Sequence, residues 1–318
     1  MRIRQPAGIG RTLDRLALVG VLSLALAACG GSASGASTTT TPDEGPASAA
    51  PAEPTIAPRP TPGTTTVQVD GEAWFAGFHL TFGTAAAEIT PGRGGIVTIE
   101  TTFENTGDED ATLDATLNLA SVGENAREAM TMDIPSVPGG LSAKGVLAFD
   151  VEDTFTFDDA VLTLGRSGNQ QAVVPLTAMA GEAVTQEPVA VTAAGSGQAG
   201  DLRIELEAGE LRADAPWKHG QMEEGSLVLT MTYSATFDSG FAGGFAFTAE
   251  NVALRLLDGT TVGVIQDGRS QSIELIGPNA TVKDLYSRFE IDDPAAGEYA
   301  FLVRSFDGAE DEIPFTID

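Results

Sequence analysis

Apolar and polar residues alternate along two stretches of the chain, VTIETTFE at 97–104 and LVLTMTYSATF at 227–237. A period of two is typical of a half-buried β-strand, because successive side chains point to opposite faces of the sheet. No long stretch has the 3.6-residue period of a helix, and only 121–129 has room for one helical turn. Shorter apolar runs predict further strands at 113–119, 146–152, 159–165, 171–177, 201–209, 247–257, 261–265, 271–276, 284–291, 298–305 and 312–317. The pattern predicts an all-β protein.

The expected strands fall into two groups, and each group has the number and spacing of strands of a β-sandwich. Roughly seven short strands separated by regular turns are typical of an immunoglobulin-like (Ig-like) sandwich. We therefore expect two tandem Ig-like β-sandwich domains, at 67–179 and 201–318. The segment 180–200 between them is rich in Ala, Gly, Thr and Gln and is interpreted as a linker.

Short motifs in both halves resemble those of Ig-like domains in bacterial surface proteins. The strand at 96–104, followed by Asn-Thr-Gly at 105–107, is similar to a signature of CARDB-type, cell-adhesion-related domains. We expect Gly107 to supply a positive φ in that turn. In the second half, 294–299 resembles the Pro-x-x-Gly-x-Tyr motif that precedes a late Ig strand, although Asp-Ser-Gly at 238–240 replaces Asn-Thr-Gly. The resemblance implies binding or spacing and carries over no catalytic residue.

The two halves also resemble each other. Phe149 and Phe289 lie in matching Phe-acidic-aliphatic triplets, and Pro175 and Pro314 each stand in the last expected strand of a half. Proline has no N–H for a ladder, so each of these strands is expected at a sheet edge or a bulge. The match favours an internal duplication, although two sandwiches of one architecture would also look alike through patterning alone.

The first 28 residues read as a secretory signal peptide. A basic segment precedes the thirteen-residue apolar run Leu16–Ala28, which is too short to span about 30 Å of hydrocarbon but suits the h-region of a signal. The run ends in Leu-Ala-Ala-Cys at 26–29, which resembles the lipobox of bacterial lipoproteins. The resemblance implies lipidation of Cys29 and cleavage before it, and two acyl chains suffice for stable anchoring. The alternative is an ordinary cleaved signal with an incidental cysteine.

Composition indicates a disordered segment and restricts the possible partners and cofactors. Residues 30–66 are almost wholly Gly, Ala, Ser, Thr and Pro, so we expect 29–66 to be a lipidated cysteine followed by a disordered stalk. The 318-residue chain carries a net charge of −28, and its sparse cations argue against a nucleic-acid partner. One cysteine excludes a disulfide framework and a cysteine-based zinc site, and two histidines leave little for histidine-based catalysis or metal ligation. We expect no cofactor.

Two motifs resemble ligand sites but have simpler interpretations. The segment 195–200 fits G-x-G-x-x-G, yet a dinucleotide site needs a helix after the motif, and 201–206 alternates like a strand. We interpret it as part of the linker. The acidic groups fall in predicted turns, where solvated turn residues are expected; the alternative is a weak structural calcium site between loops. These groups are at 108–110, 158–159, 292–293 and 307–312.

Aromatic residues in loops are candidate binding anchors. Trp-Lys-His at 217–219 lies in an expected loop, and Trp74 and His79 lie near the first strand of the first half. The alternative is that Trp217 closes the end of a sandwich and leaves His219 in solvent. Three phenylalanines in the Gly-rich stretch 240–247 would form an apolar patch if exposed, but we expect at least two of them to pack inward.

Catalysis has little support in the sequence. The chain has no G-x-S-x-G, no H-E-x-x-H and no thiol besides Cys29, and pairing of carboxylates for a glycosidase is not visible in a sequence. We therefore expect a non-enzymatic, extracytoplasmic protein of the bacterial cell envelope, anchored to a membrane by lipid, with an adhesion, scaffold or accessory protein-binding role. The alternative is a small-ligand or calcium-binding lipoprotein.

Overall fold

The structure, a computed structural model, describes residues 62–121, 125–267 and 273–318. The signal peptide, Cys29 and nearly all of the expected stalk lie outside the described residues. Within them the chain forms antiparallel strands and two short 3-10 helices, η1 (Pro216–Lys218) and η2 (Ala249–Asn251). The all-β prediction is confirmed. None of the described segments is a helix long and apolar enough to cross a membrane.

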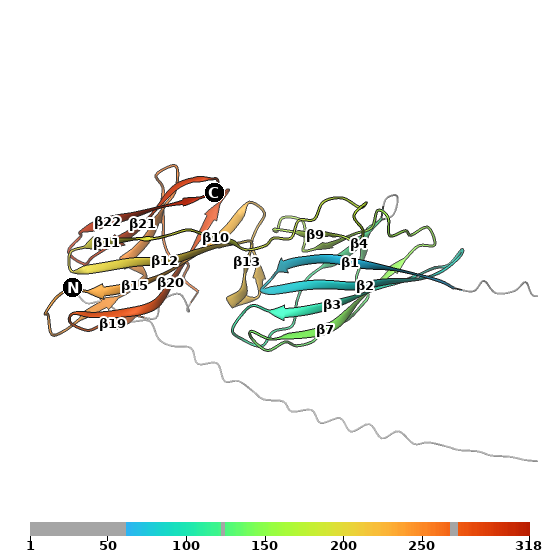
Figure 1. The fold of residues 1–318 in the computed structure, drawn as a ribbon, viewed down its shortest axis with the longest axis horizontal. Coiled ribbons are helices and arrows are strands. Elements are labelled where there is room, and N and C mark those ends of the chain that lie inside the picture. Colours follow the sequence, from blue (N-terminus) through green and yellow to red (C-terminus); the bar gives the residue numbers. More distant parts are fainter. Residues whose placement is uncertain (1–61, 122–124, 268–272) are drawn as a thin grey trace, which may run out of the picture. The chain divides into compact units, whose positions relative to one another are not determined.

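The strands of the first half form two sheets that enclose one hydrophobic core. The larger sheet has the order β1-β2-β3-β7-β6, and the smaller has the order β5-β4-β8-β9. Figure 1 shows β1, β2, β3 and β7 side by side. Apolar side chains of both sheets form a single buried cluster that includes Phe78, Phe103 and Phe149. The bounds are β1 (Gly63–Phe75), β2 (Phe78–Thr90), β3 (Gly94–Asn105), β4 (Leu117–Ala120), β5 (Arg127–Glu128), β6 (Thr131–Asp133), β7 (Ser142–Val151), β8 (Val161–Leu164) and β9 (Ala172–Pro175).

The second half has its own core between two main sheets. One has the order β10-β12-β15-β20, with β11 also paired to β12, and the other has the order β18-β17-β21-β22. Tyr233, Phe289 and Phe301 are among the fully buried side chains of this core. The bounds are β10 (Val189–Val191), β11 (Gly195–Ala199), β12 (Leu202–Arg212), β13 (Asp214–Ala215), β14 (Gly220–Gln221), β15 (Ser226–Phe237), β16 (Phe245–Phe247), β17 (Val252–Arg255), β18 (Thr261–Val262), β19 (Glu274–Ile276), β20 (Ala280–Asp292), β21 (Gly297–Arg304) and β22 (Glu310–Ile317).

The two halves share the order of their central strands, which agrees both with an internal duplication and with two sandwiches of one architecture. In each half a long central strand, β3 or β15, lies between a preceding strand and a later one, β7 or β20. The matched phenylalanines occupy equivalent places, since Phe149 faces Val97 across β7 and β3 and Phe289 faces Leu229 across β20 and β15. The last strand of each half, β9 or β22, lies at a sheet edge, as its proline predicted.

Tyr299 supports the comparison with Ig-like sandwiches. Its hydroxyl donates to the carbonyl oxygen of Ala295 at 2.9 Å and accepts the Ala295 N–H at 3.3 Å. A tyrosine that ties its own ring to backbone a few residues upstream is a feature of Ig folds, where it is known as the tyrosine corner. The Pro-x-x-Gly-x-Tyr motif at 294–299 therefore has a structural role at the start of β21.

The linker prediction for 180–200 needs correction in part: the extended piece expected at 188–191 is present as β10, but the segment belongs to the second-half sheet. This segment contains β10 and β11, which both pair with β12, and the G-x-G-x-x-G motif is strand β11. A Cβ atom on Gly195 or Gly197 would lie 2.7 Å or 2.9 Å from the side chain of Ile313. Glycine is therefore present because β22 packs closely against β11, and not because the chain is flexible. Likewise, Gly63–Thr66, which we expected in the stalk, begin β1.

Two local predictions also need correction. Gly107 does not have a positive φ. A Cβ there would lie 2.8 Å from the carbonyl oxygen of Pro216, so close backbone approach is what favours glycine. Asn105 forms the turn instead, since its buried amide donates to the carbonyls of Glu109 and Val137. The helical turn suggested for 121–129 is absent from the described part of that stretch, which contains β5, while 122–124 lie outside it.

Candidate binding groove

The outer face of the larger first-half sheet is polar. Successive side chains of a strand point to opposite faces, and in these strands the polar residues occupy the outward positions. Inward positions such as Phe82 and Phe103 join the core, while the residues between them face outward. Cross-strand register then brings outward residues of different strands into rows. One row consists of Glu72, Thr81, Thr102 and Lys144, from β1, β2, β3 and β7.

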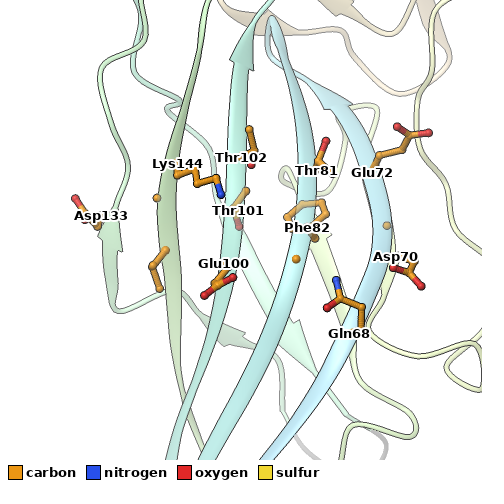
Figure 2. A pocket seen from close by; sticks show the side chains of 14 residues that line it. Gln68, Asp70, Glu72, Thr81, Phe82, Glu100, Thr101, Thr102, Asp133 and Lys144 are labelled. Carbon is orange, nitrogen blue, oxygen red and sulfur yellow. The ribbon is translucent and has the colours of Figure 1, made fainter.

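A groove of about 700 Å³ crosses this face (Figure 2). Side chains from β1, β2, β3, β7 and β6 line it, so the whole sheet contributes. Four carboxylates and one ammonium are among the lining groups, together with the amide of Gln68 and threonine hydroxyls. The charged lining residues are Asp70, Glu72, Glu100, Asp133 and Lys144.

Strand irregularities shape the middle of the groove. The β1–β2 register shifts between Gln68 and Gly71, and the β2–β3 register shifts between Phe82 and Ala85, so both shifts flank Gly83. β-Bulges of this kind bend a sheet and redirect its side chains. The three atoms nearest to a Cβ atom on Gly83 would all belong to Glu100, at an ordinary 3.6 Å. Glycine is not sterically required here, and its effect is to leave the outer face open.

An imidazole held by two carboxylates lies in the next row. His79 Nε2 lies 3.0 Å from Glu72 Oε2, and its Nδ1 lies 3.1 Å from Glu104 Oε2. Its ring stacks on Trp74 with 4.2 Å between ring centroids and 10° between planes. Carboxylates on both flanking strands thus orient His79, and one of them, Glu72, also lines the groove. The structure therefore joins the two first-half aromatic candidates, Trp74 and His79, in one arrangement.

The electrostatics of the groove are dominated by negative charge. Carboxylates outnumber the single ammonium, and the whole chain carries a net charge of −28. In a concave site beside protein of low dielectric, such a charge distribution concentrates field lines and favours cations. Lys144 lies opposite Thr102 in the β3–β7 register, so its ammonium makes the β7 side of the groove less negative than the β1 side.

Trp217 and His219, the aromatic candidates of the second half, do not line the groove. Trp217 is buried in a small apolar cluster of its own with Ala215, Met222 and Val228, and the guanidinium of Arg288 lies 3.9 Å from its ring centroid. His219 does not lie in solvent as expected. Its ring centroid is 6.1 Å from that of Phe78, and its Nδ1 is buried without a hydrogen-bond partner in the described part of the chain.

A buried ion pair lies near these aromatic residues. The side chain of Asp214 accepts a hydrogen bond from Arg212 Nε at 2.7 Å and another from the Gly77 N–H at 2.7 Å. Burial lowers the pKa of Arg212, but the hydrogen bond and charge of Asp214 together with Glu210 outweigh it and raise that pKa. The pair stabilises local structure, because it satisfies a backbone N–H that would otherwise be buried unpaired.

The Gly-rich phenylalanine segment packs as expected. Phe245 and Phe247 are buried, while Phe241 is 66% exposed. Phe245 also stacks on the exposed ring of Phe306, with 4.8 Å between centroids. At least two of the three phenylalanines therefore contribute to packing, which confirms the prediction.

The acidic turns bind their own backbone and hydroxyl groups. The Ser305 hydroxyl and then the Ala309 N–H hold the pKa of Asp307 below its usual value. The N–H and hydroxyl of Thr260 do the same for Asp258. In the described ranges, no group of three or more His, Cys, Asp or Glu residues is placed to hold a metal ion.

The sequence interpretation missed the groove itself. The polar residues at alternate positions of β3, Glu100 to Glu104, were used only as evidence for a strand. The pattern Gln68-x-Asp70-x-Glu72 in β1 was the second signal, and it went unused. Neither stretch shows that β1 and β3 lie on the two sides of β2. That arrangement depends on the long hairpin of β1 and β2. The lipidation candidate Cys29 lies outside the described residues.

Comparisons with known proteins identify no family. No protein-family model matches the chain. No curated protein matches it at a significant level. A crystal structure of a conserved hypothetical protein from Bacillus anthracis is similar over 32% of this chain and 89% of that chain, with 13% sequence identity and a TM-score of 0.25. So low a score supports no inference about fold or function.

Proposed function

We propose that this chain is a non-enzymatic binding protein of the bacterial cell envelope, anchored to a membrane through Cys29, and that its first half binds a partner protein in the groove. The observation that carries the proposal is the groove of about 700 Å³ across the outer face of β1, β2, β3, β7 and β6. Convergent polar groups in a concave surface fix the orientation of a bound group and provide specificity.

The groups around the groove suit binding better than catalysis. Both ring nitrogens of His79 face carboxylates, so neither is placed to take a proton from a hydroxyl nucleophile. The groove carboxylates come from several strands and face an open surface, whereas acid catalysis by a carboxyl group requires an environment that favours its protonated form. Recognition through charge and hydrogen bonds needs no such environment.

The envelope location rests on the N-terminal sequence. The lipobox-like segment at 26–29 and the Ser/Thr/Pro-rich segment after it are what a tethered extracytoplasmic protein requires. Cells fed an alkyne fatty acid should label the wild-type chain and leave the Cys29→Ser variant unlabelled. Equal labelling of both chains would overturn the anchor.

The partner is tested by photo-crosslinking in intact cells. A benzophenone amino acid replaces Thr81, an exposed groove residue, and in a matched control it replaces Glu207, an exposed residue of β12. We expect one stoichiometric protein adduct from position 81 and none from position 207. The same adducts from both positions, or none from position 81, would contradict a protein-binding groove.

A small ligand is the second candidate, because a volume of about 700 Å³ also lies within the range of small-molecule pockets. A small ligand that binds only the folded chain raises its melting temperature. Such a shift, abolished when Thr102 is replaced by a bulky residue and combined with an absence of protein adducts, would favour this candidate over the first.

A further inference from the structure

The outer face of β2 carries side chains at His79 and Thr81 and a glycine at the next outward position, Gly83. At His79 a side chain stands between Glu72 of β1 and Glu104 of β3. Four residues further along the same strand, Gly83 offers no side chain. Figure 2 shows Gln68 of β1 and Glu100 of β3 on the two sides of β2 in this region. Polar groups of β1 and β3 thus flank Gly83 as they flank His79, but β1 offers an amide here in place of a carboxylate, and the Thr84 hydroxyl of β2 donates to the Gln68 amide oxygen at 3.5 Å.

The contacts of His79 indicate which chemistry suits such a position. A carboxylate only accepts hydrogen bonds, and both ring nitrogens of His79 lie within hydrogen-bond distance of one. A group that donates in two directions therefore suits a position between acceptors on two strands. At the neighbouring position, the Glu100 carboxylate of β3 and the amide oxygen of Gln68 in β1 can both accept hydrogen bonds, and the negative charge of Glu100 favours a cation.

We propose that the open position over Gly83 binds the side chain of a lysine or arginine from the partner protein. This inference rests on the proposed function and adds the chemistry of the ligand. The ammonium or guanidinium group donates to the Glu100 carboxylate on one side and to the Gln68 amide oxygen on the other. Asp70 and Glu72 extend the negative surface along β1 and accommodate further cations of the same segment.

Steric room and charge both agree with this occupant. A Cβ atom on Gly83 would meet Glu100 at no less than 3.6 Å, so there is space directly above the backbone. The lining has four carboxylates against Lys144, which gives a partner cation a favourable field even though one side of the groove is less negative. Lys144 repels a cation from β7 and thereby directs it toward β1 and β3.

The test is a binding titration on the full chain in detergent at physiological salt, where unlinked surface charges are screened beyond about 8 Å. The probe is a fluorescein-labelled peptide of alternating lysine and alanine, and the control probe has every lysine acetylated. We expect the Glu100→Gln variant to bind the lysine peptide at least roughly tenfold more weakly, because one charge-assisted hydrogen bond is lost. The matched Glu205→Gln variant, changed on the exposed face of β12, should bind it like the wild type.

Substitutions of Gly83 test the position itself. Gly83→Lys places a cation of the chain's own in the site, so it should abolish peptide binding and leave the melting temperature equal to or above that of the wild type. Gly83→Ala should bind normally, since its Cβ has room. If Gly83→Lys fails to fold, Glu100→Gln decides alone, because it replaces only one exposed charge.

Several results would overturn the inference. These are equal binding of the lysine and acetyl-lysine peptides, equal losses in Glu100→Gln and Glu205→Gln, or unchanged binding by Gly83→Lys. Spermidine that displaces the peptide at equimolar concentration would show that a free polyamine is the ligand, against the partner protein proposed here. A stoichiometric adduct from position 81 would still support the proposed function in each case, so failure of the cation site and failure of the protein-binding role are distinguishable.

Discussion

Replacing Phe289 by alanine should destabilise the second half strongly. Phe289 is fully buried in β20, faces Leu229 of β15, and meets Phe301 edge-on with 5.9 Å between ring centroids and 89° between ring planes. Its ring therefore joins two strands of one sheet to β21 of the other. Alanine in its place would leave a cavity that the surrounding strands cannot readily fill, because each is fixed in a hydrogen-bonded ladder.

The expected cost follows from the burial of the ring. Removal of a fully buried phenylalanine side chain costs about 3–5 kcal/mol of unfolding free energy, and the edge-on contact places Phe289 toward the upper end. In a domain the size of the second half, 201–318, each kcal/mol of lost unfolding free energy lowers the melting temperature by roughly 4 °C. The transition of the second half should therefore fall by roughly 12–20 °C.

Scanning calorimetry of three variants checks this reasoning. Phe149→Ala makes the equivalent change in the other core, and Phe241→Ala removes a phenylalanine that is 66% exposed. We expect large shifts for the two core variants and a change within about 0.5 kcal/mol for Phe241→Ala. If Phe289→Ala shifts the transition no more than Phe241→Ala does, the inward face of β20 has been assigned wrongly. Two separate transitions, each lowered by one core variant, would show that the cores unfold independently.

Three further predictions concern polar groups. Asp214→Ala should cost about 3–5 kcal/mol in urea unfolding, because it leaves Arg212 charged and buried without its main partner, and a loss below about 1 kcal/mol would contradict the buried pair. Tyr299→Phe should cost about 1 kcal/mol by removing the hydrogen bonds to Ala295, and chemical denaturation at constant m-value measures it. The lowered pKa of Asp307 means that its ionised form stabilises the fold above the ordinary carboxyl range and that this contribution is lost as pH falls below about 4, so Asp307→Asn should flatten the acid limb of a stability–pH curve.

The sequence was sufficient to predict strands wherever one face is buried and the other is exposed. The alternation at 97–104 and 227–237 corresponds to the central strands β3 and β15, whose inward residues are among the most buried of each core. The alternation reflects solvent contact, so it survives without knowledge of the neighbouring strands. The sequence also predicted the edge strands that contain Pro175 and Pro314, because proline has no N–H to donate to a neighbouring strand.

Composition was a poor guide where small residues have a packing role. The stretch at 195–200 looks like a flexible linker because it is rich in glycine, yet Gly195 and Gly197 let β11 lie against Ile313. Gly107 looked like a turn residue with positive φ, but it allows close approach of the Pro216 carbonyl. In each case the constraint comes from a segment distant in sequence, and no local pattern records it.

The groove depends on the register of β2 with its neighbours and on the glycine at position 83, as a comparison of the two halves shows. Both halves have a β-bulge where the strand before the central strand shifts register, between Phe82 and Ala85 in β2 and between Leu206 and Ala208 in β12. The first bulge contains Gly83 and Thr84, whereas the second contains Glu207, so β2 has a bulge residue without a side chain where β12 has no such residue. The bulge alone therefore does not make a binding groove. The absence of a side chain at Gly83, between polar groups on both flanking strands, makes this face of the first half suitable for a ligand.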